Sequence, residues 1–311
     1  MINFMKYKKN SFIFSSVLII MSIFLLIFNN FNYGIDFDGG KIIQIRFDKN
    51  INIKTIKNKL NSKIKNLKIQ KISDNELIFR TSMKNKQNII KILKDNLKKY
   101  KIEIRKNDFV GPKIGNELKI NSIIALILSF ISILIYISLR FELKFSISAI
   151  LTLFHDVIIV IGFLILFKIE MNLEIIAAIL TVIGYSLNDT IIVFDRLREK
   201  INNNLDNNKI NLEDIINISL NKTLTRTTLT SLTTLFVVVT LMIFGSHSIF
   251  GFTFTIFIGI IIGTYSSIFI STGSLFPLGF SLKKYKENIK LKLIKKKQKE
   301  EIRKQIEFGV L

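Results

Sequence analysis

The segment IIAAILTVIGYSLNDTIIVFDRLREK, residues 175–200, has the length and apolar character of a helix that crosses a membrane. Asp189 lies inside its apolar part, directly after Asn188, and the charged end begins only at Asp195. A charged side chain in lipid costs roughly 2.5–3.5 kcal/mol on insertion scales. Because of this cost, an ionisable residue inside a membrane helix indicates a functional site, and Asp189 is the first candidate in this chain.

The composition of the whole chain also indicates a membrane protein. Of its 311 residues, 49% are hydrophobic, yet the formal net charge is +22 and the mean hydropathy is +0.39. This combination is typical of apolar spans joined by basic segments outside the lipid. The lack of cysteine excludes disulfides, and with His155 and His247 as the only histidines we expect no metal site.

Apolar segments predict six membrane helices. Lys and Arg gather in the two tails and in alternate connections, whereas the turns at 168–173 and 245–249 hold only Lys168. By the positive-inside rule both termini then face the cytoplasm, and the long segment 30–119 lies on the other side. The prediction is an N-terminal tail at 1–10, helices at 11–29 and, within 120–273, at about 121–139, 146–167, 174–194, 227–245 and 249–272, and a basic C-terminal tail at 274–311.

Residues 30–119, between the first two helices, predict a small folded domain. Alternating apolar and polar residues predict four strands, and amphipathic stripes predict two helices. Their order, βαββαβ, is the split βαβ pattern of ferredoxin-like α+β domains. The predicted strands are 42–47, 67–72, 76–82 and 101–110, and the predicted helices are 51–64 and 86–100.

Four motifs resemble one family of membrane proteins. They are YGIDFDGG at 33–40, VGPKIGNEL at 110–118, GYSLNDTIIVFDRLRE at 184–199 and TLTRTTLTSLTT at 223–234. In this order and on this topology they resemble the SecD/SecF family of protein-export membrane proteins, from residue 11 to about 285.

The resemblance implies a transporter architecture of the resistance-nodulation-division type, in a bacterial inner membrane with residues 30–119 in the periplasm. It implies SecD as a partner of the same layout, beside the SecYEG channel, with SecA on the same pathway and YajC as an additional candidate partner. The implied function is the use of the proton-motive force to promote late translocation of an unfolded preprotein and its release on the periplasmic side.

The predicted proton-coupling site is built on two neighbouring helices. On a helical wheel one polar stripe holds Thr181, Tyr185, Asn188 and Asp189, and a stripe on the next, antiparallel helix holds Arg226, Thr230, Thr233 and Thr234. Both stripes are expected to face protein or a wet cavity. Asp189 and Arg226 should then lie at similar depth if these helices are neighbours. We hypothesise that Asp189 carries the proton and Arg226 is its charge partner, roles that the resemblance also implies. The alternative is a fixed structural ion pair.

Three further polar residues are weaker candidates. Asn188 is expected to hydrogen-bond Asp189 or a neighbouring helix. His155 and Asp156 lie deep in the predicted helix 146–167, where they could either relay protons or form a buried pair bonded to its neighbours. Charges at the end of the opening segment, from Asp195 to Glu199, are expected to pair locally.

Two junctions connect the predicted domain to the helices. Gly39 and Gly40 permit positive φ where the chain enters the first strand, and Gly111, Pro112 and Gly115 precede the second membrane helix. We expect these junctions to act as hinges if the domain moves. Asp36 and Asp38 could bind a cation or a partner, but turn chemistry is the simpler interpretation.

Other functions are also considered. A proton-coupled exporter of small molecules would share the same half-transporter fold, and a non-transporting scaffold would not need Asp189. The charge is dispersed, which argues against nucleic acid as a partner. With no phosphate loop, nucleophile–base set or metal cluster, we expect no enzyme and no cofactor other than a proton gradient, with ATP hydrolysis left to another subunit.

Overall fold

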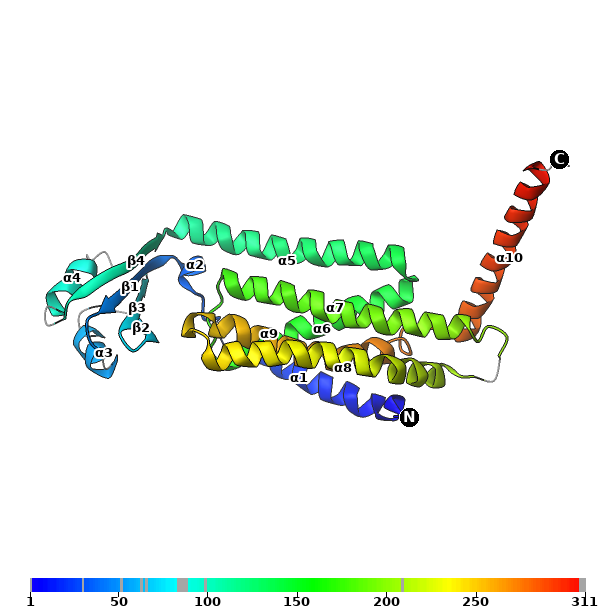
Figure 1. Ribbon diagram of the computed structural model, residues 1–311, viewed down its shortest axis with the longest axis horizontal. Helices are drawn as coiled ribbons and strands as arrows, with labels where there is room; N and C mark the ends of the chain where they lie inside the picture. The colour runs from blue at the N-terminus through cyan, green and yellow to red at the C-terminus, as the bar shows by residue number, and fades with distance from the viewer. Residues whose placement is uncertain are drawn as a thin grey trace.

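The computed structural model describes residues 2–29, 31–50, 53–61, 64, 67–82, 89–97, 100–207 and 210–307. Long helices lie side by side along the longest axis, with a small sheet domain at one end and both chain termini at the other (Figure 1). We call these the sheet end and the termini end. Six helices are long and apolar enough to cross a membrane, as predicted: α1 (Lys8–Phe28), α5 (Pro112–Arg140), α6 (Leu143–Leu166), α7 (Leu173–Asn202), α8 (Leu212–Phe244) and α9 (Phe250–Gly273).

Local sequence explains where several of these helices begin. The side chain of Asn172 accepts a hydrogen bond from the Ile175 amide at 2.9 Å and caps α7, and Asn211 caps α8 in the same way. Pro112 occupies the first turn of α5, where its missing N–H leaves no helical bond unmade. The helix starts are therefore fixed by residues outside the apolar runs.

The sheet domain has the predicted βαββαβ order. Its strands lie in the order β2-β3-β1-β4, and every neighbouring pair is antiparallel. Parts of the two predicted helices, 51–52, 62–63, 86–88 and 98–99, fall outside the described residues, as do residues 65–66 between the first of these helices and the second strand. The elements are β1 (Gly40–Phe47), α3 (Ile53–Asn61), β2 (Lys68–Ser73), β3 (Glu76–Ser82), α4 (Ile89–Asn96) and β4 (Ile102–Val110).

The alternation of β1 explains how this domain forms a core. Ile43, Ile45 and Phe47 point to one face of the sheet, because successive strand side chains alternate. They pack in one buried cluster with Leu60 of α3 and Leu93 of α4. The domain therefore has a hydrophobic core of its own, separate from the helix bundle.

Close contacts hold the three most buried bundle helices, α6, α7 and α9, together. A Cβ atom added to Gly259 of α9 would lie 2.1 Å from a methyl carbon of Val182 in α7. Gly162 of α6 approaches Ser22 of α1 equally closely. Glycine at these positions allows helix backbones to approach each other, which is the usual basis of helix packing in membranes.

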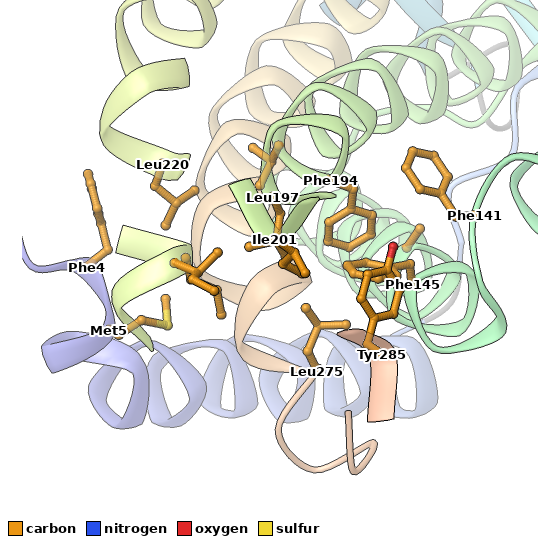
Figure 2. Close-up of a cluster of buried hydrophobic side chains, with 14 of the residues drawn as sticks. Phe4, Met5, Phe141, Phe145, Phe194, Leu197, Ile201, Leu220, Leu275 and Tyr285 are labelled. Atoms are coloured by element: carbon orange, nitrogen blue, oxygen red, sulfur yellow. The ribbon is translucent and has the colours of Figure 1, made fainter. Parts of the chain in front are cut away.

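Parts of both predicted tails, 1–10 and 274–311, pack against the helix bundle. Residues Phe4–Tyr7 form a short 3-10 helix, and Phe4 and Met5 are buried. After α9, the chain turns and forms α10 (Leu282–Glu307), whose Tyr285 is buried. Figure 2 shows Phe4, Met5 and Tyr285 in one apolar cluster with Phe145 and Phe194. Apolar residues among the lysines of the tails explain this docking.

Candidate functional site

Asp189 lies buried where α7, α8 and α9 meet. The residue is 5% exposed. It lines a small hollow that is too narrow to hold a water molecule. The lining residues include Tyr185, Ser186, Ser231, Gly263 and Thr264. The carboxyl group is thus surrounded by hydroxyl groups and close-packed backbone.

One hydrogen bond fixes the register between α7 and α8. The hydroxyl groups of Tyr185 and Thr234 are 3.2 Å apart. Because the two helices are antiparallel, Asp189, one turn further along α7, lies level with Thr230, one turn earlier in α8. Arg226 lies another turn earlier, which is about 6 Å at 1.5 Å per residue. Asp189 and Arg226 therefore differ in depth by roughly one helical turn.

The structure does not join Asp189 and Arg226 directly. Among the described residues, no ion pair links the two side chains within 4.0 Å. Arg226 is exposed and lines a different, open hollow with Asp195, Glu199 and Lys222. Arg226 lies nearer the termini end than Asp189, and their depths along the helix axes agree to within about one turn. A fixed structural ion pair between them is not what this conformation contains.

Asn188 does not make the expected hydrogen bond. It is exposed, and neither Asp189 nor a neighbouring helix of the described chain bonds to it. The reason is the helix geometry, since consecutive residues point about 100° apart and Asn188 turns away from the bundle. Thr181 on α7 and Thr233 on α8 are also exposed, so a polar stripe runs along the outside of these two helices.

Thr230, another predicted supporting residue, makes its side-chain hydrogen bond within its own helix, α8. Thr230 donates from its side chain to the carbonyl oxygen of Arg226 at 2.9 Å. Such bonds to the preceding turn are common for Thr in membrane helices. Tyr185, in contrast, bonds across helices to Thr234.

Asp156 and His155 form a second buried polar cluster, where α6, α7 and α9 meet. His155 Nδ1 lies 2.8 Å from Asp156 Oδ1. The other carboxylate oxygen accepts hydrogen bonds from the hydroxyl groups of Ser186 at 2.5 Å and Ser266 at 2.8 Å. Of the two sequence alternatives, a pair bonded to its neighbours is therefore present, and a relay role remains open.

The charged end of α7 pairs locally, as expected. Asp195 forms an ion pair with Arg140 of α5, and Arg196 pairs with Glu199 at 2.5 Å. Arg198 donates to the backbone carbonyl of Arg140 at 3.0 Å. These contacts tie the termini end of α7 to α5.

The two junctions lie against each other. Residues Ile35–Asp38 form a single helical turn, α2, and Gly39 and Gly40 follow it with φ of 71° and 157°. A Cβ at Gly115 of α5 would lie 2.7 Å from the backbone oxygen of Phe37. Gly115 thus permits close packing of α2 on α5, whereas Gly111 caps α5 with nothing within 4 Å of its Cβ position.

Asp36 has a specific contact in this region. Its carboxylate accepts a hydrogen bond from the Leu173 amide, 3.2 Å away, at the first turn of α7. A carboxylate at a helix N-terminus is favoured both by the unpaired amide groups and by the helix dipole. The Asp36 carboxylate thus contributes to capping α7, a long-range contact that differs from the local turn chemistry expected from the sequence. In the described part of the chain, no group of three His, Asp or Glu residues is arranged to hold a metal ion.

Sequence reasoning missed the hydroxyl groups that surround the two acids. Ser186, Ser231, Thr264 and Ser266 come from three helices and meet only in the folded bundle. The segment GTYSS at 263–267 is the one available signal, because small and hydroxylated residues in a membrane helix usually face another helix.

Comparison with known proteins identifies the family. Residues 89–280 match the family model described as "Protein export membrane protein SecD/SecF, C-terminal". The chain belongs to the SecD/SecF family. This confirms the resemblance carried by the four sequence motifs and, with the six apolar helices, a multi-pass membrane protein of a protein-transport family.

Curated SecD/SecF relatives cover most of the chain. The protein translocase subunit SecF of Helicobacter pylori strain J99 is 42% identical over 99% of this chain and 97% of its own length. That of Calditerrivibrio nitroreducens is 45% identical over 88% of this chain and 92% of its own. The match thus extends through both the sheet domain and the bundle.

Two solved SecDF structures have the same fold. The crystal structure of SecDF from Thermus thermophilus, described as a translocon-associated membrane protein, matches with a TM-score of 0.78 and 32% identity over 89% of this chain. A SecDF structure in the super-membrane-facing form matches with a TM-score of 0.68 and 30% identity over 95% of this chain. This chain covers only 38% and 40% of those two chains.

Proposed function

We propose that this chain is the SecF-type half of a SecDF assembly in a bacterial inner membrane. In this assembly it uses the proton-motive force to promote late preprotein translocation and release on the periplasmic side. The names of its relatives and its match to less than half of the SecDF chains support the assignment. The observation that carries the coupling role is Asp189, buried in an apolar helix without an ion-pair partner, one turn from Arg226.

This separation gives a switch. A carboxyl group in a dry, hydroxyl-lined hollow is favoured in its neutral, proton-bearing form, whereas a carboxylate is favoured beside a guanidinium group. Arg226 has a long, flexible stem and lies about one turn away, within its reach after a modest helix shift. Loading a proton on Asp189 thus suits the conformation described above, and releasing it suits one in which Arg226 moves closer. One proton crossing 100 mV supplies roughly 2.3 kcal/mol for such a change.

The exposed polar stripe supports a membrane partner of similar layout. Thr181, Asn188 and Thr233 lie on the outside of α7 and α8. The two threonine hydroxyl groups bond to carbonyl oxygens of their own helices, whereas lipid would leave the side-chain amide of Asn188 unpaired. A second helix bundle, which we assign to SecD, would cover this stripe and complete the SecDF length that this chain lacks. SecYEG, YajC and SecA belong to the same proposal as further components of the pathway, with ATP hydrolysis supplied by SecA and no enzymatic step by this chain.

The proposed orientation places the sheet domain in the periplasm and the termini end in the cytoplasm. Basic residues support it, since Lys8, Arg140, Arg198 and the lysines of α10 all lie at the termini end. Protons would then enter from the sheet end, pass Asp189 and leave toward the hollow that Arg226 lines.

The deciding experiment is translocation with Asp189→Asn. Asparagine keeps the shape of the side chain and removes its titration. In membrane vesicles that contain the complete translocase, we expect the proton gradient to stop accelerating the completion of preprotein translocation, while the ATP-driven stage continues. Arg226→Gln should have the same effect, because it removes the charge that draws the proton off.

Glu174→Gln is the matched control. It removes an exposed carboxylate of the same helix, in its first turn and away from both Asp189 and the hollow that Arg226 lines, so gradient stimulation should persist. If Asp189→Asn vesicles retain stimulation at the wild-type rate, the coupling role of Asp189 is wrong.

A further inference from the structure

His155 carries an unused nitrogen in the interior of the bundle. The residue is 4% exposed, and among the described residues its Nε2 atom has no hydrogen-bond partner. A buried polar atom without a partner is unfavourable and calls for an explanation, of which a functional role is one.

The cluster around His155 binds one proton without leaving a net charge. With Asp156 ionised and His155 neutral, the site holds one uncompensated negative charge inside an apolar helix bundle, which is unfavourable. A proton on Nε2 makes the ring an imidazolium next to the carboxylate, and the pair becomes neutral. Asp156 already accepts from Ser186 and Ser266, so its ionised form is well hydrogen-bonded. The site can thus gain and lose one proton with little rearrangement.

Ser186 connects this cluster to Asp189. The hydroxyl group of Ser186 donates to Asp156 of α6, and Ser186 also lines the hollow that Asp189 faces. Ser186 and Asp189 are three residues apart on α7, so they lie on the same face of the helix. A hydroxyl group both donates and accepts, which is what a relay between two carboxyl groups requires.

The depth of the groups gives the relay a direction. Asp156 is ten residues from the sheet end of α6 at Leu166, or about 15 Å, whereas Asp189 is sixteen residues from the sheet end of α7 at Leu173, or about 24 Å. His155 and Asp156 therefore lie nearer the sheet end than Asp189, and Arg226 lies beyond Asp189. A proton that moves from the sheet end would therefore reach His155 and Asp156 first, then Asp189 and finally Arg226.

Few other titratable groups face this cluster. On the helices packed against α6, only Tyr185 and Asp189 of α7 and Tyr265 of α9 lie at a comparable depth. Tyr265 is engaged with Ser15 of α1, and Tyr185 with Thr234. The remaining charged residues of α1, α5, α7 and α9 lie toward their ends, as do Lys8, Lys113 and Glu174.

We propose that His155 and Asp156 form an outer proton-binding station that supplies Asp189 through the Ser186 hydroxyl. A proton from the sheet end binds Nε2 of His155, and the Nδ1 proton passes to Asp156. The Asp156 carboxyl group then turns so that its protonated oxygen faces Ser186, and the Ser186 hydroxyl turns toward the ionised Asp189. In one concerted step the Ser186 hydroxyl gives its proton to the Asp189 carboxylate and takes up the proton of Asp156. One proton moves in total, and Asp156 and Ser186 regain their initial state, while His155 remains neutral as its other tautomer until its ring resets.

This proposal rests on the proposed function, because it needs Asp189 to be the proton carrier. The competing role for the cluster is a purely structural clamp that holds α6, α7 and α9 together. A clamp would affect stability but would not link the translocation rate to the pH on the outer side. The two roles therefore differ in a measurable way.

The test uses inside-out membrane vesicles with the complete translocase and a lumenal pH that is varied at constant membrane potential. We expect His155→Gln and Asp156→Asn to lower gradient-stimulated translocation by about a hundredfold, the lower range for loss of a positioned proton donor or acceptor. His155→Gln should also flatten the dependence of stimulation on lumenal pH. Ser186→Thr, which keeps the hydroxyl, should retain stimulation that Ser186→Ala loses.

The outcomes separate the two proposals. If Asp189→Asn abolishes stimulation while His155→Gln keeps the wild-type pH profile, the relay is overturned and the coupling role of Asp189 stands. If stimulation survives in all variants, both proposals fail. If Asp156→Asn prevents insertion, the pair Ser186→Thr and Ser186→Ala decides, since equal stimulation in these two variants overturns the relay.

Discussion

Replacing Gly259 by alanine should separate α7 from α9 at the level of the Asp189 hollow. The added Cβ would lie 2.1 and 2.6 Å from the two methyl carbons of Val182 and 2.9 Å from its Cβ. Ordinary contact begins near 3.4 Å, so the helices must part by about 1.3 Å, the difference between 3.4 and 2.1 Å. Overpacking of this kind costs about 1–3 kcal/mol.

Val182→Ala should relieve only part of this strain. With both methyl groups gone, the remaining 2.9 Å contact with the Cβ of residue 182 requires the two helices to part by about 0.5 Å, the difference between 3.4 and 2.9 Å. The double variant should therefore be more stable than the sum of the two single effects predicts, by about 0.5–3 kcal/mol, the usual coupling of residues in contact.

The assay is the unfolding temperature of the purified subunit in detergent, in a double-mutant cycle. Each kcal/mol corresponds to a shift of about 2–4 °C for a chain of this size class. Gly184→Ala is the matched control, because it is a helical glycine of α7 with nothing within 4 Å of its Cβ position. It should be neutral or stabilising by up to about 1 kcal/mol. An unchanged unfolding temperature for Gly259→Ala would refute the close-packing argument.

Two other predictions concern ion pairs outside the membrane helices. Arg80 of β3 pairs with Glu170 at 2.6 Å, so Arg80→Glu should loosen the sheet domain from the bundle, and adding Glu170→Arg should restore protection of the contact in hydrogen exchange. Asp206 pairs with Lys290 of α10 at 2.7 Å, which lowers the pKa of Asp206 below its ordinary 3.8. A lowered pKa means that this contribution to α10 docking is complete above about pH 3.8 and is lost as the pH falls through the folded value. Distances between spin labels on α8 and α10 should therefore lengthen only in acid, and Asp206→Asn should remove that pH dependence.

Much of the fold follows from periodicity alone. Long apolar runs predict the six helices because lipid requires them, and the alternation of Ile43, Ile45 and Phe47 predicts a half-buried strand. The buried position of Asp189 was predictable for a related reason, since a carboxylate at this depth has to face protein. These features depend on local sequence and on the cost of exposing polar groups to lipid.

The remaining features depend on contacts between distant residues. The single-turn offset of Arg226 is set by the bond between Tyr185 and Thr234, which a helical wheel does not contain. Ser266 bonds to Asp156, which is 110 residues away in the sequence. The backbone amide of Met5 donates a hydrogen bond to the side chain of Asn217 in α8 at 3.0 Å. Neither pairing leaves a periodic pattern, because each involves one residue from each of two helices.

α7, the helix that carries Asp189, begins next to the segment through which the chain enters the sheet domain. Asp36 of α2 caps its first turn, and Tyr33 forms a β-bridge with Met171 just before it. The Asp189 carboxyl lies about 24 Å from that anchor along a continuous helix. A displacement of the sheet domain would therefore be transmitted along α7 to the level of Asp189 as an axial shift or a tilt of the helix. If Asp189 carries the proton as proposed above, pulling on the domain should change how readily Asp189 takes up a proton, and proton uptake should in turn move the domain.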